Sequence, residues 1–408
     1  LFNKRNNMLS NSQITEIVEY QNIQKKKKKL GLKRERLKEI VLYESFVLLI
    51  TGVRRSGKST LLLQLLNENK DQSLFLNFED PRLAGFALPD FQKLDSIIKD
   101  KNVKNLFFDE IQIVEGWELY VRQKLDEGFK VAVTGSNATL LSREMGTKLT
   151  GRNLPYELFP FSYREFLEFK NLESNPDSVK NYMENGGFPE FLNLENGLVL
   201  QRLLVDVLNR DIAVRFAIRD VNSLQQLAVY LISNIGKPVS ANKLKDLFGL
   251  KSVSAIADYF SHLENTYLVQ FLPKFSYSLK TQIRNPKKVY VVDLGLFTHV
   301  SIVFTDELGR RLENMVYLHL RRKYPEVYYF NEKKECDFIA IQQGKTKEII
   351  QVCYDLNQDN LQREIAGLMD ALNYFEEETG KIITFNQKDR FEKDGKVIEV
   401  LPFHEFVS

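Results

Sequence analysis

Short apolar runs alternate with helical patterns in the first part of the chain, between residues 46 and 161. Amphipathic stretches with helical spacing, such as Thr60–Leu66 and Trp117–Glu127, separate these runs. Because strands that alternate with helices pair in parallel and carry helices on both faces, the predicted fold class is α/β with a parallel sheet. The predicted strands are Phe46–Ile50, Leu74–Phe78, Leu106–Phe108 and Val131–Val133.

The pattern then changes to consecutive helices. Leu198–Leu231 is helical throughout, and two shorter helices follow, Ser240–Phe248 and Ser252–Glu264, with a brief turn between them. Strand-like runs come next, at Tyr267–Phe275 and Lys288–Val292. Helices followed by strands differ from the alternation before them, which indicates a separate part of the fold.

From Glu307 the pattern is helix, strands, helix and strand, which predicts a second α/β domain. With roughly 100–200 residues per domain, a chain of 408 residues has room for several domains. We divide it into a polar, helix-prone arm (residues 1–43), an α/β core (44–197), a mostly helical segment (198–304) and a C-terminal domain (305–408).

Composition excludes several classes of protein. Hydrophobic residues make up 43% and charged residues 27%, a balance that excludes a largely disordered chain. No apolar run approaches the roughly 18 residues that cross a bilayer, and Leu1–Ser10 is too polar for a secretory signal. Two cysteines and four scattered histidines exclude a disulfide scaffold and argue against a zinc site. We therefore expect a cytoplasmic protein with no membrane partner.

The net charge of +3 hides an uneven distribution. Residues 1–40 carry eleven Lys and Arg against four Asp and Glu, and residues 236–290 carry nine against three. Residues 306–408 are acidic, with fifteen against twenty. The run Lys25–Lys29 suits either a phosphate backbone or an acidic partner, but it is also typical of a solvated helix face.

Residues 52–59 fit the pattern G-x-x-x-x-G-K-[ST] at every fixed position. The segment follows an apolar strand and opens a helix, so its backbone N–H groups are expected to surround phosphate oxygens. Lys58 is the candidate for the β- and γ-phosphates, and Ser59 for Mg²⁺. The predicted ATP-binding residues are Gly52, Val53, Arg54, Arg55, Ser56, Gly57, Lys58, Ser59 and Thr60.

Polar residues also follow the next apolar strands. Asp109 ends one strand, where it can hold Mg²⁺, and Glu110 is then placed to act as a general base on the attacking water. Asn137 lies beyond another strand and is the candidate for orienting water or contacting the γ-phosphate. Ser136 and Asn137 equally suit a helix cap. Ligands bind at the carboxyl ends of such strands, which favours the functional interpretation.

These motifs resemble those of prokaryotic AAA-plus ATPases, in the subgroup related to the archaeal ATPases and to the signal-transducing (STAND) ATPases. The resemblance implies an additional strand between the phosphate-loop strand and the Asp109 strand, a helical lid, and ATP bound at a subunit interface of a ring-type homo-oligomer. It is carried by Thr51–Leu61, Asp109-Glu110, Thr134–Asn137, Thr150–Arg152, Phe159–Ser162 and Asn185–Glu190.

An arginine from a neighbouring subunit can stabilise the charge that builds on the transferring phosphoryl group. Arg152 is the leading catalytic candidate, in the family-like Gly151-Arg152 step, followed by Arg143. Arg210 and Arg215 of the predicted lid are further candidates. Each of these arginines also suits an ordinary surface ion pair.

The segment Pro238–Asp293 resembles a winged helix. Its predicted wing, Lys274–Lys288, interleaves basic residues with Phe275 and Tyr277, as expected for contact with DNA or RNA. Few long polar side chains lie on the second helix, which argues against sequence-specific recognition, and such domains also serve as packing modules. The basic residues are Lys274, Lys280, Arg284, Lys287 and Lys288.

The C-terminal domain resembles the restriction-endonuclease-like fold. Glu313 on a helix and Asp337 at a strand start match the acids of that fold, which hold Mg²⁺ in active members. Gln351 stands where the next acid belongs, and Cys353 where a lysine belongs. An amide binds Mg²⁺ more weakly than a carboxylate, so we expect a degenerate site without cleavage. Glu313 and Asp337 also suit ordinary surface charges, and Cys353 a buried strand residue.

The predicted function is therefore an oligomeric AAA-plus ATPase that hydrolyses ATP with Mg²⁺ and drives a conformational change, acting on nucleic acid. Two alternatives stay open. One is a STAND-like switch that assembles on ligand binding, and the other is an ATP-gated, metal-dependent nuclease.

Overall fold

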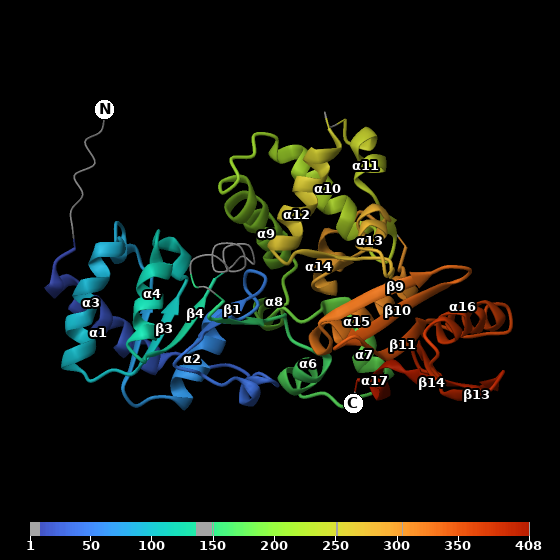
Figure 1. Cartoon of the computed structure of the whole chain (residues 1–408), viewed down its shortest axis with the longest axis horizontal. Coiled ribbons are helices and arrows are strands. Elements are labelled where there is room, and N and C mark those ends of the chain that lie inside the picture. The colour runs from blue at the N-terminus through green and yellow to red at the C-terminus, as the bar shows by residue number, and fades with distance from the viewer. Residues whose placement is uncertain (1–8, 136–148, 150, 250–251, 304, 408) are drawn as a thin grey trace. The chain divides into compact units, whose positions relative to one another are not determined.

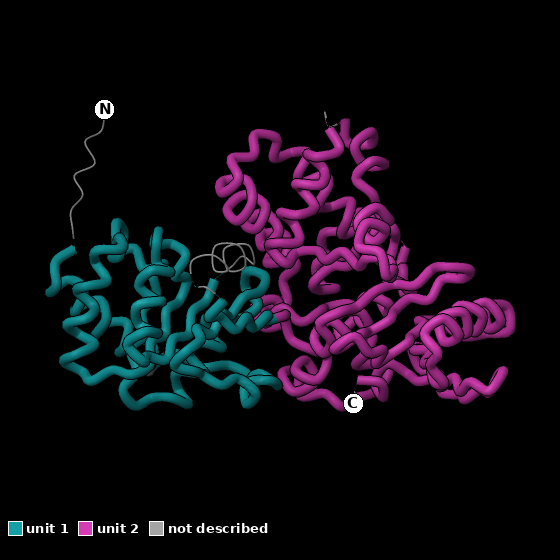
Figure 2. Tube along the Cα trace, viewed as in Figure 1, with its two compact units in different colours: residues 1–158 teal, residues 159–408 magenta. Residues whose placement is uncertain are grey.

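The computed structural model describes residues 9–135, 149, 151–249, 252–303 and 305–407. The chain forms two compact units, residues 1–158 and residues 159–408 (Figure 2). In the described part of the chain, no helix combines the length and the apolar character that crossing a membrane requires.

The first unit contains a five-stranded parallel sheet with the order β2-β3-β4-β1-β5. The four predicted strands are confirmed, each shifted by no more than two residues at either end. The strand β4 lies between β1 and β3, as the resemblance implied. The strands are β1 (Val47–Thr51), β2 (Ser73–Asn77), β3 (Asn105–Asp109), β4 (Lys130–Thr134) and β5 (Asn153–Glu157).

Helices cover both faces of this sheet (Figure 1). Along β1, Val47 and Leu49 enter the apolar core shared with α1, α3 and α4, whereas Leu48 and Ile50 enter the core shared with α2. Successive side chains of a strand point to opposite faces, so a strand buried on both sides reads as one apolar run. The helices are α1 (Asn11–Lys27), α2 (Lys58–Glu68), α3 (Phe91–Asp100) and α4 (Trp117–Asp126), with short 3₁₀ helices at Leu37–Glu39, Pro81–Leu83, Leu88–Asp90 and Ile111–Ile113.

The N-terminal arm packs onto this sheet. Ile14, Ile17 and Val18 of α1 are buried in its core, and Ser10 caps the helix with Gln13. The carboxamide of Gln21 donates to the Asn77 carbonyl oxygen (3.1 Å) and accepts from the Asn77 N–H (2.8 Å). Because β2 is an edge strand, this amide satisfies backbone groups that have no neighbouring strand on that side.

The second unit begins with helices and a three-stranded antiparallel sheet, order β6-β8-β7. The long predicted helix Leu198–Leu231 is interrupted: a π-helical segment, Val207–Ala213, follows α9, and α10 starts at Val221. The elements are α6 (Tyr163–Lys170), α7 (Pro176–Asn185), α8 (Pro189–Leu194), α9 (Leu198–Asp206), α10 (Val221–Ser233), β6 (Pro238–Val239), α11 (Ala241–Leu247), α12 (Val253–Asn265), β7 (Val269–Leu272), α13 (Leu279–Arg284), β8 (Lys287–Val291) and α14 (Leu294–Val300).

The two strands predicted for the wing pair antiparallel as β7 and β8, but the wing differs from the prediction in two respects. The segment between β7 and β8 contains the helix α13 rather than a plain two-stranded hairpin. Phe275 is buried in the C-terminal apolar core, and Lys288 is buried as well, so neither faces solvent as a nucleic-acid contact would. Tyr277, by contrast, is 84% exposed.

The C-terminal part has a six-stranded mixed sheet, order β13-β14-β12-β11-β10-β9, with α16 packed on it. This confirms the predicted α/β arrangement after residue 307. The elements are α15 (Leu308–Lys323), β9 (Glu326–Asn331), β10 (Glu335–Gln342), β11 (Lys345–Val352), α16 (Leu361–Tyr374), β12 (Thr379–Thr384), β13 (Asp389–Lys393), β14 (Lys396–Pro402) and α17 (Phe403–Phe406).

The loop between α7 and α8 packs tightly against distant segments of the second unit. The Gly187 N–H donates to the carboxylate of Asp293, and the Gly187 carbonyl oxygen accepts from the Phe161 N–H (2.8 Å). A Cβ on Gly187 would lie 2.2 Å from the Phe161 carbonyl oxygen. Two motifs noted in the sequence, Asn185–Glu190 and Phe159–Ser162, are therefore joined by close backbone contact.

We expect Gly187→Ala to lower the free energy of unfolding by roughly 1–3 kcal/mol and the melting temperature by about 2–12 °C, because the backbone must move to admit the methyl group. Differential scanning calorimetry measures both. Gly309→Ala is the matched control, since apart from its chain neighbours and the backbone of its own helix no heavy atom lies within 4 Å of its Cβ position. Equal melting temperatures for the two variants would contradict the close contact at Gly187.

Candidate active site

The loop between β1 and α2 depends on a glycine at its start. Gly52 has φ +138°, and a Cβ on it would lie 2.1 Å from the Leu158 carbonyl oxygen. The Leu158 N–H donates to the Thr51 carbonyl oxygen (2.8 Å), so the chain after β5 is held against this point. The loop therefore turns where only glycine fits, and a backbone that curves in this way can surround an anion.

Lys58 is buried and folds back over the loop. Its Nζ donates to the carbonyl oxygens of Gly52 and Val53, both at 3.0 Å. In the described structure the buried hydroxyl oxygen of Ser56 has no hydrogen-bond partner. A phosphate oxygen accepts from both an ammonium and a hydroxyl, so these residues fit a triphosphate. The other predicted ATP-binding residues, Arg54, Arg55, Gly57, Ser59 and Thr60, lie in the same loop or in the first turn of α2.

Asp109 and Ser59 are brought together at the end of β3. Asp109 Oδ1 accepts from Ser59 Oγ (3.0 Å) and from Thr134 Oγ1 (2.6 Å). Burial raises the pKa of Asp109, against the opposing effect of these two hydrogen bonds. A carboxylate beside a hydroxyl at the phosphate loop is a donor set that suits Mg²⁺, and a bound cation would favour the ionised carboxylate.

Glu110 follows Asp109 in a left-handed conformation, with φ +52°. Its N–H donates to Thr134 Oγ1 (2.9 Å), and its carboxylate accepts from Gln112 Nε2. The turn separates the side chains of the two acids, so that one can hold a cation and the other can face the nucleophile. Thr134 thus positions both acids, a role that sequence reasoning did not assign, although it belongs to the motif Thr134–Asn137. Asn137 lies outside the described residues.

Arg34 is a second residue that sequence reasoning missed. This arm residue is buried, and its Nη1 donates to the Ser56 carbonyl oxygen (3.1 Å) in the phosphate loop. The arm is also attached to α2, because Gln64 Nε2 donates to the carbonyl oxygens of Leu30 (2.8 Å) and Leu32 (2.7 Å). Nothing in the sequence pattern distinguishes Arg34 from the exposed basic residues around it.

The arginine candidates occupy different places. Arg152 precedes β5, the neighbour of β1, and lies at the amino ends of these parallel strands, whereas the phosphate loop follows the carboxyl end of β1; Arg152 forms an ion pair with Asp126 (2.6 Å). Arg210 lies 4.0 Å from Asp206 and is largely exposed, and the Arg215 guanidinium lies 5.6 Å from the Phe216 ring centroid. Arg143 lies outside the described residues. Arg152 cannot reach the phosphate loop of its own sheet.

In the second unit, Glu313 and Asp337 converge on a lysine from β8. Lys288 Nζ lies 2.8 Å from Asp337 Oδ1, 3.0 Å from Glu313 Oε1 and 2.9 Å from Glu335 Oε1. The Tyr290 hydroxyl donates to Glu313 Oε1 (2.6 Å). Burial raises the pKa of Glu313 to about 7, although Lys288 opposes this shift, and the acids raise the pKa of Lys288 in spite of its own burial. The two predicted acids are thus neutralised by a side-chain cation.

Gln351 lies next to this cluster and contacts other groups. Its Oε1 accepts from the Asp337 N–H (3.3 Å), and its Nε2 donates to Glu364 Oε2 (2.7 Å). Glu364 is a buried acid of α16 that sequence reasoning missed. Burial raises the pKa of Cys353 to about 11, which fits a packed residue rather than a nucleophile.

Comparison with known proteins identifies the first domain. Residues 44–167 match a family model described as an AAA domain, and residues 176–307 match a domain of unknown function, DUF8612. The protein MJ1544 of Methanocaldococcus jannaschii is 37% identical over 398 residues, which cover 90% of this chain and 89% of that protein. The chain belongs to the family of MJ1544 and carries an AAA domain.

This family also reaches bacteria. A Haemophilus influenzae protein is 31% identical to this chain over 381 residues, or 87% of this chain and 92% of that protein. Among solved structures, a Walker-type ATPase of Pyrococcus abyssi aligns with a TM-score of 0.40 and 15% identity, over 71% of this chain and 94% of that one. The AAA domain contains the loop 52–59 and both Asp109 and Glu110.

Proposed function

We propose that this AAA-domain protein is an ATPase that binds ATP with Mg²⁺ at the loop 52–59 and hydrolyses it. The observation that carries the proposal is the convergence of Ser59, Asp109 and Thr134 beside the loop, at 3.0 and 2.6 Å. These residues come from α2, β3 and β4, so one helix and two strands place polar groups at one point. A glycine-rich turn that fits the motif only by chance would not have these three polar side chains beside it.

Each residue has a distinct part in the proposed reaction. Lys58 exchanges its two carbonyl partners for the β- and γ-phosphate oxygens, and the loop N–H groups hold the remaining oxygens. Ser59 and Asp109 hold Mg²⁺, which supplies positive charge to the phosphates. Glu110 accepts a proton from the attacking water, and Asn137 contacts the γ-phosphate. All of these groups act by position and charge.

We further propose that the active form is a homo-oligomer of the ring type. Arg152 supports this, because it lies at the amino end of β5, away from its own phosphate loop at the carboxyl end of β1, and can therefore face the site of a neighbouring copy. For Arg152 to act on the ATP of a neighbouring copy, its ion pair with Asp126 would have to break, or Asp126 would have to stay outside that ATP site. An arginine supplied in trans accelerates phosphoryl transfer by about 10³–10⁵ where it has been measured.

The proposed target is nucleic acid, with a winged helix as the domain that contacts it. The order α10, β6, α11, α12, β7, α13, β8 and the antiparallel sheet β6-β8-β7 support a winged-helix fold with a helix inserted in its wing. Lys280 and Arg284 on α13 are exposed, unlike Lys288. A STAND-like switch would use the same ATP site without a nucleic acid. The nuclease alternative loses support, because Lys288 stands between the two acids that would hold a metal.

The test is to measure the size of the protein by light scattering, with and without a slowly hydrolysed ATP analogue and with and without duplex DNA. ATP turnover is measured under the same conditions. We expect the analogue to increase the mass and DNA to raise the turnover. Assembly with no effect of DNA would favour the switch, and an unchanged mass together with no turnover would refute the proposed function.

A further inference from the structure

The lysine run of the arm is fixed in place at both ends. On one side, Gln21 pairs with both backbone groups of Asn77, at 2.8 and 3.1 Å. On the other, the carbonyl oxygens of Leu30 and Leu32 accept from Gln64 of α2. The residues between these anchors cross the open edge of the sheet beside β2. The run is therefore part of the fold of the first unit, and not a solvated tail.

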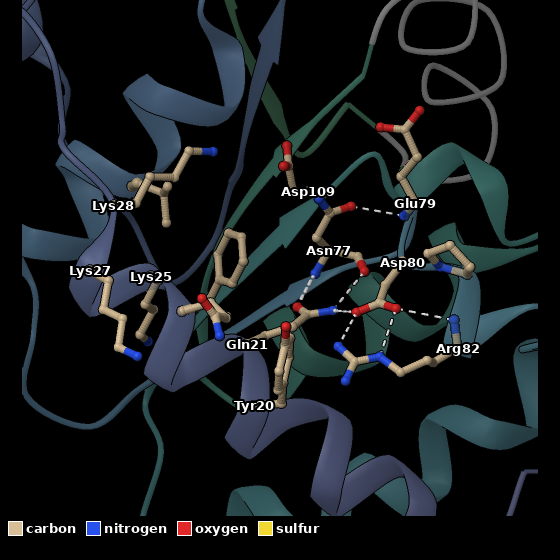
Figure 3. Close-up of a pocket in the computed structure, with 14 residues that line it drawn as sticks. Tyr20, Gln21, Lys25, Lys27, Lys28, Asn77, Glu79, Asp80, Arg82 and Asp109 are labelled. Atoms are coloured by element: carbon tan, nitrogen blue, oxygen red, sulfur yellow. Dashed lines mark hydrogen bonds and ion pairs between the residues drawn. The ribbon is translucent and has the colours of Figure 1, made fainter.

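This crossing forms one wall of a cavity of about 980 Å³ (Figure 3). The opposite wall comes from the end of β2 and the segment after it, and Asp109 lies at the margin that the cavity shares with the ATP site. The loop 52–57, which the structure describes in full, is not part of the lining. A volume at the upper end of the roughly 300–1,000 Å³ of ligand pockets leaves room for more than a terminal phosphate.

The charge of the lining favours an anion. Asp80 and Arg82 form an ion pair (2.6 Å), and the hydrogen bond from Arg82 lowers the pKa of Asp80 to about 2. The charges of these two side chains therefore neutralise each other. Counted together, the lining carries Lys25, Lys27, Lys28 and Arg82 against Glu79, Asp80 and Asp109, a net charge of +1. Lys27 and Lys28 are exposed at the mouth of the cavity. Net positive charge in a concave site concentrates polyanions there.

The lining also contains aromatic surface. Tyr20 is 47% exposed, and the Arg82 guanidinium covers one face of its ring at 3.9 Å from the centroid. Phe75 also borders the cavity, but its ring is buried in the core shared with α2, so Tyr20 supplies the exposed ring. Cations that follow a backbone next to aromatic rings are the combination that binds single-stranded nucleic acid, since every base has a face to stack.

We propose that this cavity binds a single strand of nucleic acid through its phosphates and thereby stimulates ATP hydrolysis. The inference rests on the proposed function for its target and adds the binding site. Coupling has a physical route, because Gln21 contacts the end of β2, and Arg34, further along the same arm, contacts the Ser56 carbonyl oxygen of the phosphate loop.

The experiment uses the full chain and a fluorescent oligothymidylate. The variant Lys25→Gln/Lys27→Gln/Lys28→Gln is expected to bind the oligonucleotide at least tenfold more weakly than the wild type. The slope of log affinity against log salt should fall by about 2, since each phosphate contact with a single strand contributes roughly 0.7. The rise in ATP turnover on addition of the oligonucleotide should disappear.

The matched control is Lys99→Gln/Lys101→Gln/Lys104→Gln, which removes the same charge from exposed lysines near the start of β3. It should bind and respond as the wild type does. The double variant Lys27→Gln/Lys28→Gln alters only exposed side chains, so an intermediate loss of affinity there supports the site even if the triple variant folds poorly.

Other outcomes overturn the inference in distinguishable ways. Equal oligonucleotide affinity in the wild type and the cavity variant would place the binding site elsewhere and leave the proposed function standing. A higher KM for ATP with unchanged oligonucleotide affinity would assign the cavity to the nucleotide. Equal stimulation by polyglutamate would point to an acidic protein partner. No oligonucleotide binding by an active wild type would refute both this site and the nucleic-acid target, but not the ATPase.

Discussion

Replacing Lys58 with alanine is expected to lower the turnover of ATP by at least about 100-fold, the usual effect of removing one preorganised donor from a charged transition state. The Lys58 ammonium is buried at the loop and is held by two carbonyl oxygens at 3.0 Å. Arg34 contacts the loop from outside, where its guanidinium donates to the Ser56 carbonyl oxygen.

The turnover is measured by phosphate release at saturating ATP and Mg²⁺, and nucleotide affinity by equilibrium titration. Lys33→Ala is the control. Lys33 is an exposed arm residue that pairs with Glu68 of α2, and its loss should leave turnover within about twofold, because exposed ion pairs contribute little. Wild-type turnover in Lys58→Ala would mean that hydrolysis takes place elsewhere, and the proposed function would fail.

The sheet of the first unit was predictable because its strands are buried on both faces. Such strands appear as continuous apolar runs, and the residues that end them, such as Asp109, mark the carboxyl edge where ligands bind. The loop 52–59 was predictable as well, because glycines and a lysine at this fixed spacing are what binding of phosphate groups requires. The order of the strands came from the family resemblance and not from the pattern.

Contacts between distant segments were not predictable. The sequence gives no sign that Arg34 reaches the phosphate loop, or that Gln21 covers the edge of β2. Composition counted Lys288 as part of a basic, solvent-facing wing. One indication was present in the sequence, because Lys288 lies in the strand 287–291 and shares a strand face with Tyr290. A lysine at a buried position of a strand needs an acidic partner, and no pattern says which acid supplies it.

The cluster around Lys288 explains how two acids can persist in a domain whose nuclease motif is incomplete. Without a cation, Glu313 and Asp337 would place two carboxylates at one buried site. Lys288 supplies the positive charge from β8, and Tyr290 adds a hydrogen bond. We interpret the acids as a structural ion cluster that joins the three-stranded sheet to α15 and β10 of the same unit.

We expect Lys288→Met to destabilise this unit by roughly 3–5 kcal/mol at pH 8, the range for leaving a buried charge without its partner. The loss should be smaller at pH 6. Burial already raises the pKa of Glu313 to about 7 from 4.5, so the folded protein binds more protons than the unfolded chain between these values, and its stability falls as the pH rises through them. Without Lys288 the pKa of Glu313 rises further, and the destabilisation extends to higher pH.

Hydrogen exchange measured by mass spectrometry locates the effect. Peptides from β8, β10 and α15 should exchange faster in Lys288→Met, whereas peptides from β1 to β4 of the first unit should not change. Lys287→Met is the control on the same strand, because Lys287 is outside the cluster and only half-buried. Adding Glu313→Gln to Lys288→Met should recover part of the stability, since one uncompensated charge is removed. A destabilisation independent of pH, or no recovery in the double variant, would show that Lys288 contributes through packing and that the ion cluster does not hold these elements together.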